Sequence, residues 1–117
     1  MTAPLASSRQ FSLEEASRLL PSVKLVTAEA VREAEELSRE LRQHGEAHPK
    51  HEALTEQLDS VVSRWASRLK ELQVEAKGLW LVDFDNGEGY YCWCHPESAI
   101  THFHGYDEGF AGRMKIV

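Results

Sequence analysis

Several features that assign a protein to a specialised class are scarce in this sequence. Its 117 residues include only two cysteines, too few for the disulfide framework of a small secreted domain. No apolar run reaches the roughly 20 residues that span a bilayer, and residues 1–10 lack the basic and apolar regions of a signal peptide. We therefore expect a cytoplasmic protein without a membrane partner, in which both cysteines are reduced thiols.

Basic residues are nearly absent from the C-terminal third. From Gly78 onward the chain has two Lys+Arg against six Asp+Glu, a balance of 2 − 6 = −4 within a net charge of −6. Nucleic-acid binding requires clustered cations that neutralise phosphates, so nucleic acid is not an expected partner. Residues 86–89 contain two glycines but neither the lysine nor the length of a phosphate-binding loop. No cofactor is indicated by such a motif.

The features that are present describe an ordinary folded domain. The length suits one hydrophobic core, and the hydrophobic fraction of 42% is typical of globular proteins. Residues 1–10 have no periodicity and are predicted to be a flexible tail. A single domain is predicted over residues 11–117. Its first part, 11–77, is expected to be helical, and its second part, 78–117, is expected to form a sheet and a C-terminal clasp.

The first helix has a recognisable beginning. Ser12 and Glu15 have the spacing of a capping box, in which each side chain binds the backbone N–H of the other residue. The helical pattern meets Pro21, which cannot donate a hydrogen bond to the preceding turn. Either one helix kinks there, or a short helix ends and a longer one begins with proline in its first turn. We favour the second interpretation.

Two long amphipathic helices are predicted next. The first runs from Pro21 to about His44, and the second follows Pro49, includes Leu54 as its first apolar residue and ends near Gly78, with apolar residues at steps of three or four. Gly45 and Pro49 interrupt the pattern between them, as expected for a turn. The three histidines of this turn, at 44, 48 and 51, are interpreted as a solvated loop. Two helices joined in this way form an antiparallel hairpin.

The remaining chain has the period of β-strands. Strands are predicted at Leu79–Phe84, Tyr90–Cys94 and Ile100–His104, and the Asn86–Gly87 pair favours a hairpin turn. Residues 114–117 are a candidate fourth strand. The expected fold class is α+β: a long antiparallel helical hairpin with a preceding short helix, packed on a small three- to four-stranded antiparallel β-meander.

The predicted lengths also suggest an assembly. Helices of this length extend roughly 36–40 Å, whereas three short strands cover an area of only about 14 by 18 Å. The sheet can therefore bury only part of the hairpin seam. We expect a homodimer in which two hairpins pair into a four-helix bundle. The alternative is a monomer in which the first short helix covers the remaining apolar surface.

Alternation along the strands brings polar side chains to one face of the sheet. That face is predicted to contain Asp83, Cys92, Cys94, His102 and His104, opposite an aromatic face that packs on the helices. The two cysteines and two histidines are candidate ligands for zinc or a similar divalent metal. The alternative is a structural role, because Cys-x-Cys is not a common zinc spacing and a buried free cysteine often serves as a small apolar residue.

A hydrolase would need a nucleophile, a base and an orienting acid. Cys92 or Cys94 could combine with His104 and Asp83, but the sequence context of an activated nucleophile is missing. Catalytic residues are therefore not assigned.

The last constellation runs from Asp107 to Arg113. Glycines on both sides of Phe110 allow the backbone to turn around an aromatic anchor, and Arg113 could pair with Asp83 or Asp107. One interpretation is a structural clasp that closes the sheet. The other is a site for a small anion or carboxylate that uses Arg113 and His104. The candidate ligand-binding set is Asp83, His104, Asp107 and Arg113.

Several motifs occur in order along the chain: Phe11–Ala16, Leu19–Pro21, Gly78, Leu81–Phe84, Cys92–Trp93, His104 and Gly109–Arg113. Through these motifs the sequence resembles DUF2203, a bacterial family of unknown function. The resemblance implies a helical hairpin with a sheet, and no established activity. In this chain Cys94 stands where the family pattern has a basic residue, and His102 occupies a position of an aromatic one. The family-like polar residues are Asp83, Cys92, His104, Asp107 and Arg113.

Two functions are compatible with these observations. The first is a non-enzymatic homodimer that acts structurally or binds a protein partner through its helices. The alternative is a metal- or small-ligand-binding protein that uses Asp83, His104 and Arg113 on the polar sheet face.

Overall fold

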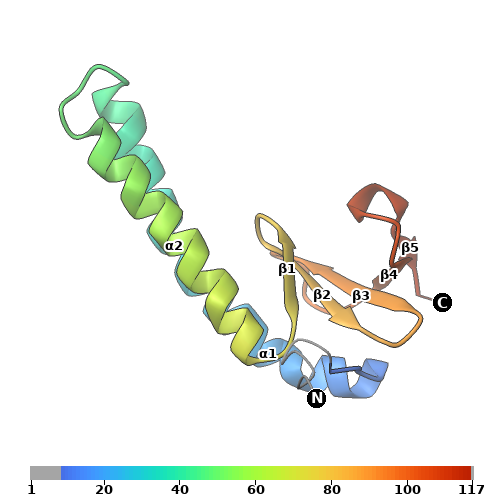
Figure 1. The fold of residues 1–117 in the computed structure, drawn as a ribbon. Coiled ribbons are helices and arrows are strands. Elements are labelled where there is room, and N and C mark those ends of the chain that lie inside the picture. The colour runs from blue at the N-terminus through green and yellow to red at the C-terminus, as the bar shows by residue number, and fades with distance from the viewer. Residues whose placement is uncertain (1–8, 117) are drawn as a thin grey trace, which may run out of the picture.

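The computed structural model describes residues 9–116 and consists of two helices followed by an antiparallel sheet (Figure 1). Helix α1 spans Leu13–His44 and α2 spans His51–Glu71. The hairpin that they form projects away from the sheet, which lies beside only one end of it (Figure 1). The expected α+β class and helical hairpin are confirmed. The predicted tail at residues 1–10 lies almost wholly outside the described residues.

The beginning of α1 is the one expected. Ser12 accepts from the backbone N–H of Glu15 at 3.1 Å, and the Glu15 carboxylate accepts from the N–H of Ser12 at 2.9 Å. The preceding residue, Phe11, is buried and packs edge-on against Phe84 with ring centroids 5.6 Å apart. Its N–H donates to the carbonyl of Asp85 at 2.7 Å. The cap therefore fixes both the start of the helix and its position against the sheet.

The predicted break at Pro21 was wrong, because α1 continues through it. Ala16, Leu20 and Val23 are all buried on the sheet side, while the Pro21 ring is exposed. Proline inside a helix costs about 3 kcal/mol, whereas each large apolar side chain contributes about 1.5–3 kcal/mol when buried. Continuous burial of this face therefore outweighs the lost hydrogen bond. The residues that were predicted to form a separate short helix are the first turns of α1.

The second helix is shorter than predicted. It ends at Glu71, and residues that were expected to be helical form strand β1, Glu75–Gly78. Gln73 adopts a positive φ of 65°, a left-handed conformation that ends the helical path. Val74 is buried just after it. In this short stretch the spacing of Leu72 and Ala76 fits a helix, whereas that of Val74 and Ala76 fits a strand, so periodicity could not distinguish the two.

The sheet has five strands in the order of the chain, one more than the maximum predicted. Strand β2 spans Leu81–Asp85 and β3 spans Gly89–Cys94; β4 spans His102–Gly105 and starts two residues later than predicted. Strand β5, Met114–Lys115, lies within the candidate fourth strand. A short 3-10 helix, η2, Phe110–Gly112, precedes β5.

Trp80 belongs to a turn rather than to the predicted strand. It adopts a positive φ of 64° between β1 and β2, an unfavourable conformation for a bulky residue. Its ring packs edge-on against Trp65 of α2, with centroids 4.9 Å apart. Packing on the helix supports the strained turn.

The core lies between the inner face of the sheet and the base of the hairpin. Val82, Phe84 and Trp93 have no measurable exposure there. A buried polar contact crosses the hairpin, in which the indole Nε1–H of Trp65 donates to Thr27 Oγ1 at 2.9 Å. The helices therefore cover one face of the sheet and leave the other to the C-terminal segment.

Candidate functional site

The strand register places the predicted polar residues on the outer face of the sheet. Asp83 pairs with Cys92, and Cys92 pairs with His102, so these residues form one row across three strands. In the neighbouring row His104 pairs with Tyr90. The side chains of this face point away from the helices because they alternate with the core residues.

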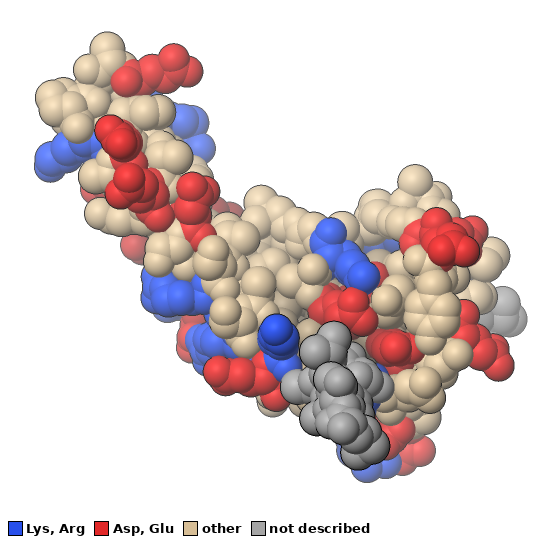
Figure 2. Space-filling model, in the orientation of Figure 1, with Lys and Arg blue, Asp and Glu red and all other residues tan. Residues whose placement is uncertain are grey.

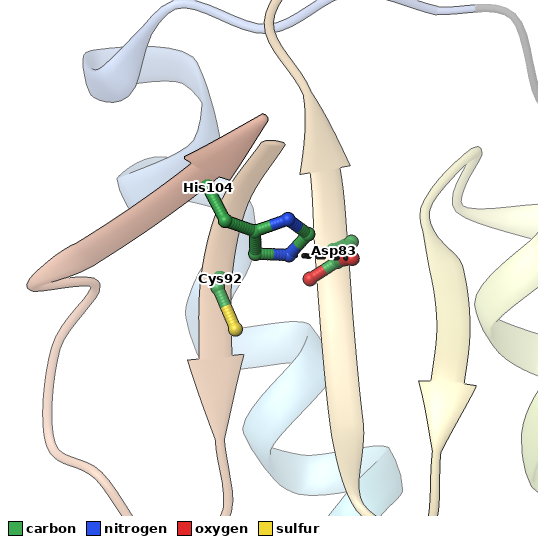
Figure 3. Close-up of side chains that lie close together, drawn as sticks. All are labelled: Asp83, Cys92 and His104. Atoms are coloured by element: carbon green, nitrogen blue, oxygen red, sulfur yellow. Dashed lines mark ion pairs between the residues drawn. The ribbon is translucent and has the colours of Figure 1, made fainter. Parts of the chain in front are cut away.

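Three of these side chains form a buried cluster, which consists of Asp83, Cys92 and His104 (Figure 3). A carboxylate oxygen, the Sγ atom and an imidazole nitrogen all lie within 4.8 Å of one another, and all three residues are buried. Each comes from a different strand, and the side chains point toward one another. Residues distant in sequence thus supply three different kinds of metal-ligating atom to one point.

The other two predicted metal ligands lie outside this cluster. The Cys94 thiol contacts the carbonyl oxygen of His95 at 3.5 Å, and the His102 ring contacts the Thr101 hydroxyl at 2.9 Å. Cys94 is two residues beyond Cys92, a displacement of roughly 6.5–7 Å along the strand. The predicted set Cys92, Cys94, His102 and His104 is therefore not assembled among the described residues.

Hydrogen bonding fixes the tautomer of His104. Its Nδ1 lies 2.9 Å from the carbonyl oxygen of Gly105. A carbonyl can only accept, so Nδ1 carries the proton. The other ring nitrogen, Nε2, lies 3.0 Å from Asp83 Oδ2, with both side chains almost fully buried. This arrangement directs Nε2 toward the carboxylate, as second-shell carbonyls orient the histidine ligands of metals.

The Asp83 carboxyl group is incompletely satisfied. It is 1% exposed, and Oδ2 has no hydrogen-bond partner of good geometry among the described residues. Its separation from Nε2 is short enough for an ion pair, but the contact is poorly aligned for a hydrogen bond. Burial raises the pKa of this carboxyl, while His104 and a hydrogen bond from Cys92 oppose the increase.

The Cys92 thiol is poorly suited to nucleophilic catalysis in this state. Burial, together with the nearby Asp83 charge, raises its pKa to about 12, so the thiol is protonated at neutral pH. The ring nitrogen that would have to accept its proton instead faces Asp83. Cys92 and His104 therefore do not form the thiolate–imidazolium arrangement of cysteine hydrolases.

The outer face is covered by the segment that follows β4. A cavity of about 310 Å³ lies between the cluster and this segment, with Tyr90, Tyr106, Asp107 and Phe110 among its lining residues. The Tyr106 hydroxyl donates to Asp85 Oδ1 at 2.6 Å, a hydrogen bond that raises the pKa of Tyr106 to about 12. The cluster is thus nearly inaccessible to solvent but adjoins a pocket that is partly open, because Tyr106 and Phe110 in its wall are exposed.

Gly89 allows the close strand approach that positions His104. A Cβ atom on Gly89 would lie 2.4 Å from the carbonyl oxygen of His104, closer than non-bonded atoms approach. The strand partner of Gly89 is Gly105, so two residues without side chains face each other next to the cluster. Glycine at position 89 is therefore required for the observed spacing of β3 and β4.

The predicted ligand set separates into two groups. Asp83 and His104 meet, and Asp107 lines the adjoining cavity. Arg113 instead pairs with Glu97 at 2.6 Å and lies over the Phe110 ring at 4.7 Å. Arg113 thus pairs with a carboxylate, but with Glu97 instead of Asp83 or Asp107, and it connects the β3–β4 turn to the C-terminal segment.

The cavity is also lined by residues outside the site predicted from the sequence, among them Lys77, Tyr90 and Tyr106. Tyr90 could have been identified, because it shares strand parity with Cys92. Lys77 was assigned to a helix, and the position of Tyr106 depends on the path of the chain after β4. The alternation of residues along the predicted strands gives no information about the position of Lys77 or of Tyr106.

The fold and site together define a small α+β protein with a mixed-ligand cluster on the outer face of its sheet. A family model described as "Uncharacterized conserved protein (DUF2203)" matches residues 9–116. The chain belongs to this family. No curated protein and no solved structure has significant similarity to it. Neither described helix is sufficiently long and apolar to cross a membrane.

Proposed function

We propose that this protein binds one transition-metal ion of the zinc class through Asp83, Cys92 and His104. The observation that carries the proposal is the buried 3.0 Å contact between His104 Nε2 and Asp83 Oδ2. Because Nδ1 holds the ring proton, Nε2 of a neutral imidazole presents a lone pair to a carboxylate oxygen. Two acceptors this close repel each other unless a second proton or a cation compensates.

A second proton compensates only part of the arrangement. On the imidazole it would form a buried ion pair in which Oδ2 still lacks a well-aligned donor among the described residues, and on the carboxyl group, whose pKa burial raises, it would leave a neutral pair. Burying an ionised carboxylate is costly unless its oxygen atoms are satisfied. A metal ion can bind the oxygen and nitrogen together without lying on the line between them. It also binds the neighbouring sulfur, which in the metal-free protein is a thiol that only donates a hydrogen bond to the carboxyl group.

The separations are close to those of ligands around one ion. With Zn–N and Zn–O distances near 2.0–2.1 Å, two donors at a tetrahedral angle lie about 3.3 Å apart, and a sulfur–nitrogen pair about 3.5 Å. The nitrogen and oxygen in the structure are 3.0 Å apart, and the largest separation in the cluster is at most 4.8 Å. A side-chain adjustment on the order of 1 Å would complete the site.

The donor types favour a particular class of ion. A thiolate, an imidazole and a carboxylate suit zinc, cobalt or ferrous iron, whereas calcium and magnesium prefer oxygen ligands. The high pKa of Cys92 describes the metal-free thiol; coordination replaces its proton with the metal ion. The cluster therefore has the chemistry of a transition-metal site.

Cobalt provides a direct test of the three ligands. Full-length protein without a histidine tag would be freed of metal and titrated with Co²⁺ while absorbance is recorded. We expect a one-to-one end point and a thiolate-to-cobalt charge-transfer band. Cys92→Ser should remove that band, and His104→Ala should weaken binding at least tenfold. Elemental analysis of the protein as purified measures the native metal.

Two matched variants control for non-specific effects. Cys94→Ser changes the other thiol, and His102→Ala changes another histidine of the same strand. Both should leave the end point and the band intact, with circular dichroism reporting the fold. Absence of one-to-one binding, or transfer of the band's dependence from Cys92 to Cys94, would refute the assignment.

A second candidate function is homodimerisation through the helical hairpin. The outer part of the hairpin has no third described element against it (Figure 1), and its Leu37, Leu41 and Leu58 side chains are only partly buried. A second hairpin would bury these leucines in a four-helix arrangement. The surrounding surface has acidic and basic side chains close together (Figure 2), which permits alternating charge pairing between copies.

Light scattering tests the dimer. A protein of twice 13.3 kDa is expected at micromolar concentration, and Leu37→Glu combined with Leu58→Glu should return it to the monomer. Leu25→Glu, at an exposed leucine near the base of α1, is the matched control. A monomeric parent protein would contradict this candidate and would leave the metal proposal unaffected.

A further inference from the structure

The proposed metal site has protein ligands on only one side. Three donors form the described cluster, and its other side adjoins the cavity of about 310 Å³. Structural zinc ions generally have four protein ligands, whereas zinc ions with three keep a position for water or an exchangeable ligand. The volume is at the small end of ligand pockets. An ion bound by the cluster would therefore be accessible to a small molecule.

The charge around the cavity disfavours an anion in that position. Asp83 and the Cys92 thiolate together balance a divalent ion. Among the described residues that line the cavity, Lys77 is the only Lys or Arg. Its ammonium group lies 2.9 Å from Glu75 Oε1, so its charge is already paired. Asp107 also lines the cavity and places a carboxylate near the open side. An anionic ligand would bring a further negative charge into the cavity, where no unpaired Lys or Arg among the described lining residues could compensate it.

The cavity is also lined by aromatic rings. The Tyr90 ring lies edge-on to the Tyr106 ring, with their centroids 5.1 Å apart. The centroid of the Tyr90 ring lies 5.4 Å from that of the His104 ring. Phe110 forms part of the same wall and remains 49% exposed. Flat rings can accept a planar ligand by edge-to-face or offset contact. Charge and shape thus favour an uncharged planar base.

From these observations we propose that the fourth position on the metal takes an uncharged nitrogen ligand of the imidazole type. This inference rests on the proposed metal site and adds the class of molecule that it binds. A ring nitrogen donates its lone pair to the metal without changing the net charge of the centre. The ring then lies among Tyr90, Tyr106 and Phe110.

Cobalt-loaded full-length protein tests the ligand class. The visible ligand-field spectrum would be followed during titrations with imidazole, sodium acetate and sodium phosphate, at constant ionic strength. Imidazole should change the spectrum saturably, and the charge-transfer band should persist, which shows that cobalt remains bound. Acetate and phosphate should require at least tenfold higher concentrations.

A charge reversal tests the reason for the preference. Asp107→Lys should strengthen phosphate binding roughly three- to tenfold at low ionic strength, while Glu46→Lys, in the exposed hairpin turn, should not change it. Failure to bind cobalt would overturn the metal site itself. A cobalt-loaded protein that prefers either anion, or responds to none of the three probes, would overturn only the ligand class.

Discussion

Asp83 and His104 meet across an intervening strand. Asp83 lies on β2 and His104 on β4, with β3 between them, yet Oδ2 and Nε2 are 3.0 Å apart. In the metal-free protein a second proton compensates this contact, and His104→Ala removes the imidazole that shares this proton with the buried carboxyl group. We predict a loss of about 3 kcal/mol in the free energy of unfolding, measured by urea denaturation with a chelator present.

The solvent-accessible neighbour provides the comparison for that measurement. His102→Ala should change the same free energy by less than about 0.5 kcal/mol, as is usual for surface substitutions. Equal losses in the two variants would mean that the contact between Asp83 and His104 contributes nothing specific.

Metal affinity should increase with pH. The Cys92 thiol has a pKa of about 12 in the metal-free protein, so it is protonated throughout the neutral range. Binding as a thiolate must then release one proton, and affinity should increase about tenfold per pH unit from this group. Titration calorimetry in buffers of different ionisation enthalpy measures the release. A Cys92→Ser variant that releases as many protons as the parent would contradict this origin.

Thr27 should contribute to stability through its hydroxyl group. It is fully buried and accepts the hydrogen bond from Trp65 across the hairpin. Thr27→Val keeps the shape but leaves the indole N–H unsatisfied, which should cost about 1–3 kcal/mol. Thr27→Ser retains the acceptor and removes one methyl group. Chemical denaturation should therefore rank serine above valine; the reverse order would exclude the hydrogen bond as the dominant effect.

Arg113 should hold the C-terminal segment against the sheet. Its side chain is 9% exposed, pairs with Glu97 and lies over Phe110. Arg113→Ala should accelerate hydrogen exchange at Ile116, whose N–H donates to the carbonyl of Thr101. Arg113→Lys should restore protection only partly, because lysine lacks the planar fork. Unchanged exchange at Ile116 in both variants would contradict this role.

Local chemistry and periodicity predicted much of the fold. The Ser12–Glu15 capping box, the hairpin turn at Gly45 and the Asn86–Gly87 turn depend on neighbouring residues, and each lies at the expected place. Strand alternation likewise assigned Asp83, Cys92 and His104 to one face. The prediction at Pro21 failed because burial against distant elements outweighed the local preference of proline. The prediction at β1 failed because the local apolar pattern did not distinguish a helix from a strand.

The sequence by itself determined which residue types could meet on the polar face, because alternation along a strand is a local property. Only the tertiary structure decided which of them do meet. Register set Cys92 beside Asp83, the backbone of Gly105 fixed the tautomer of His104, and the segment after β4 covered the cluster. Arg113 pairs with Glu97 and not with Asp83 or Asp107. These outcomes depend on pairings between distant segments, and the spacing of residues along the chain does not encode them directly.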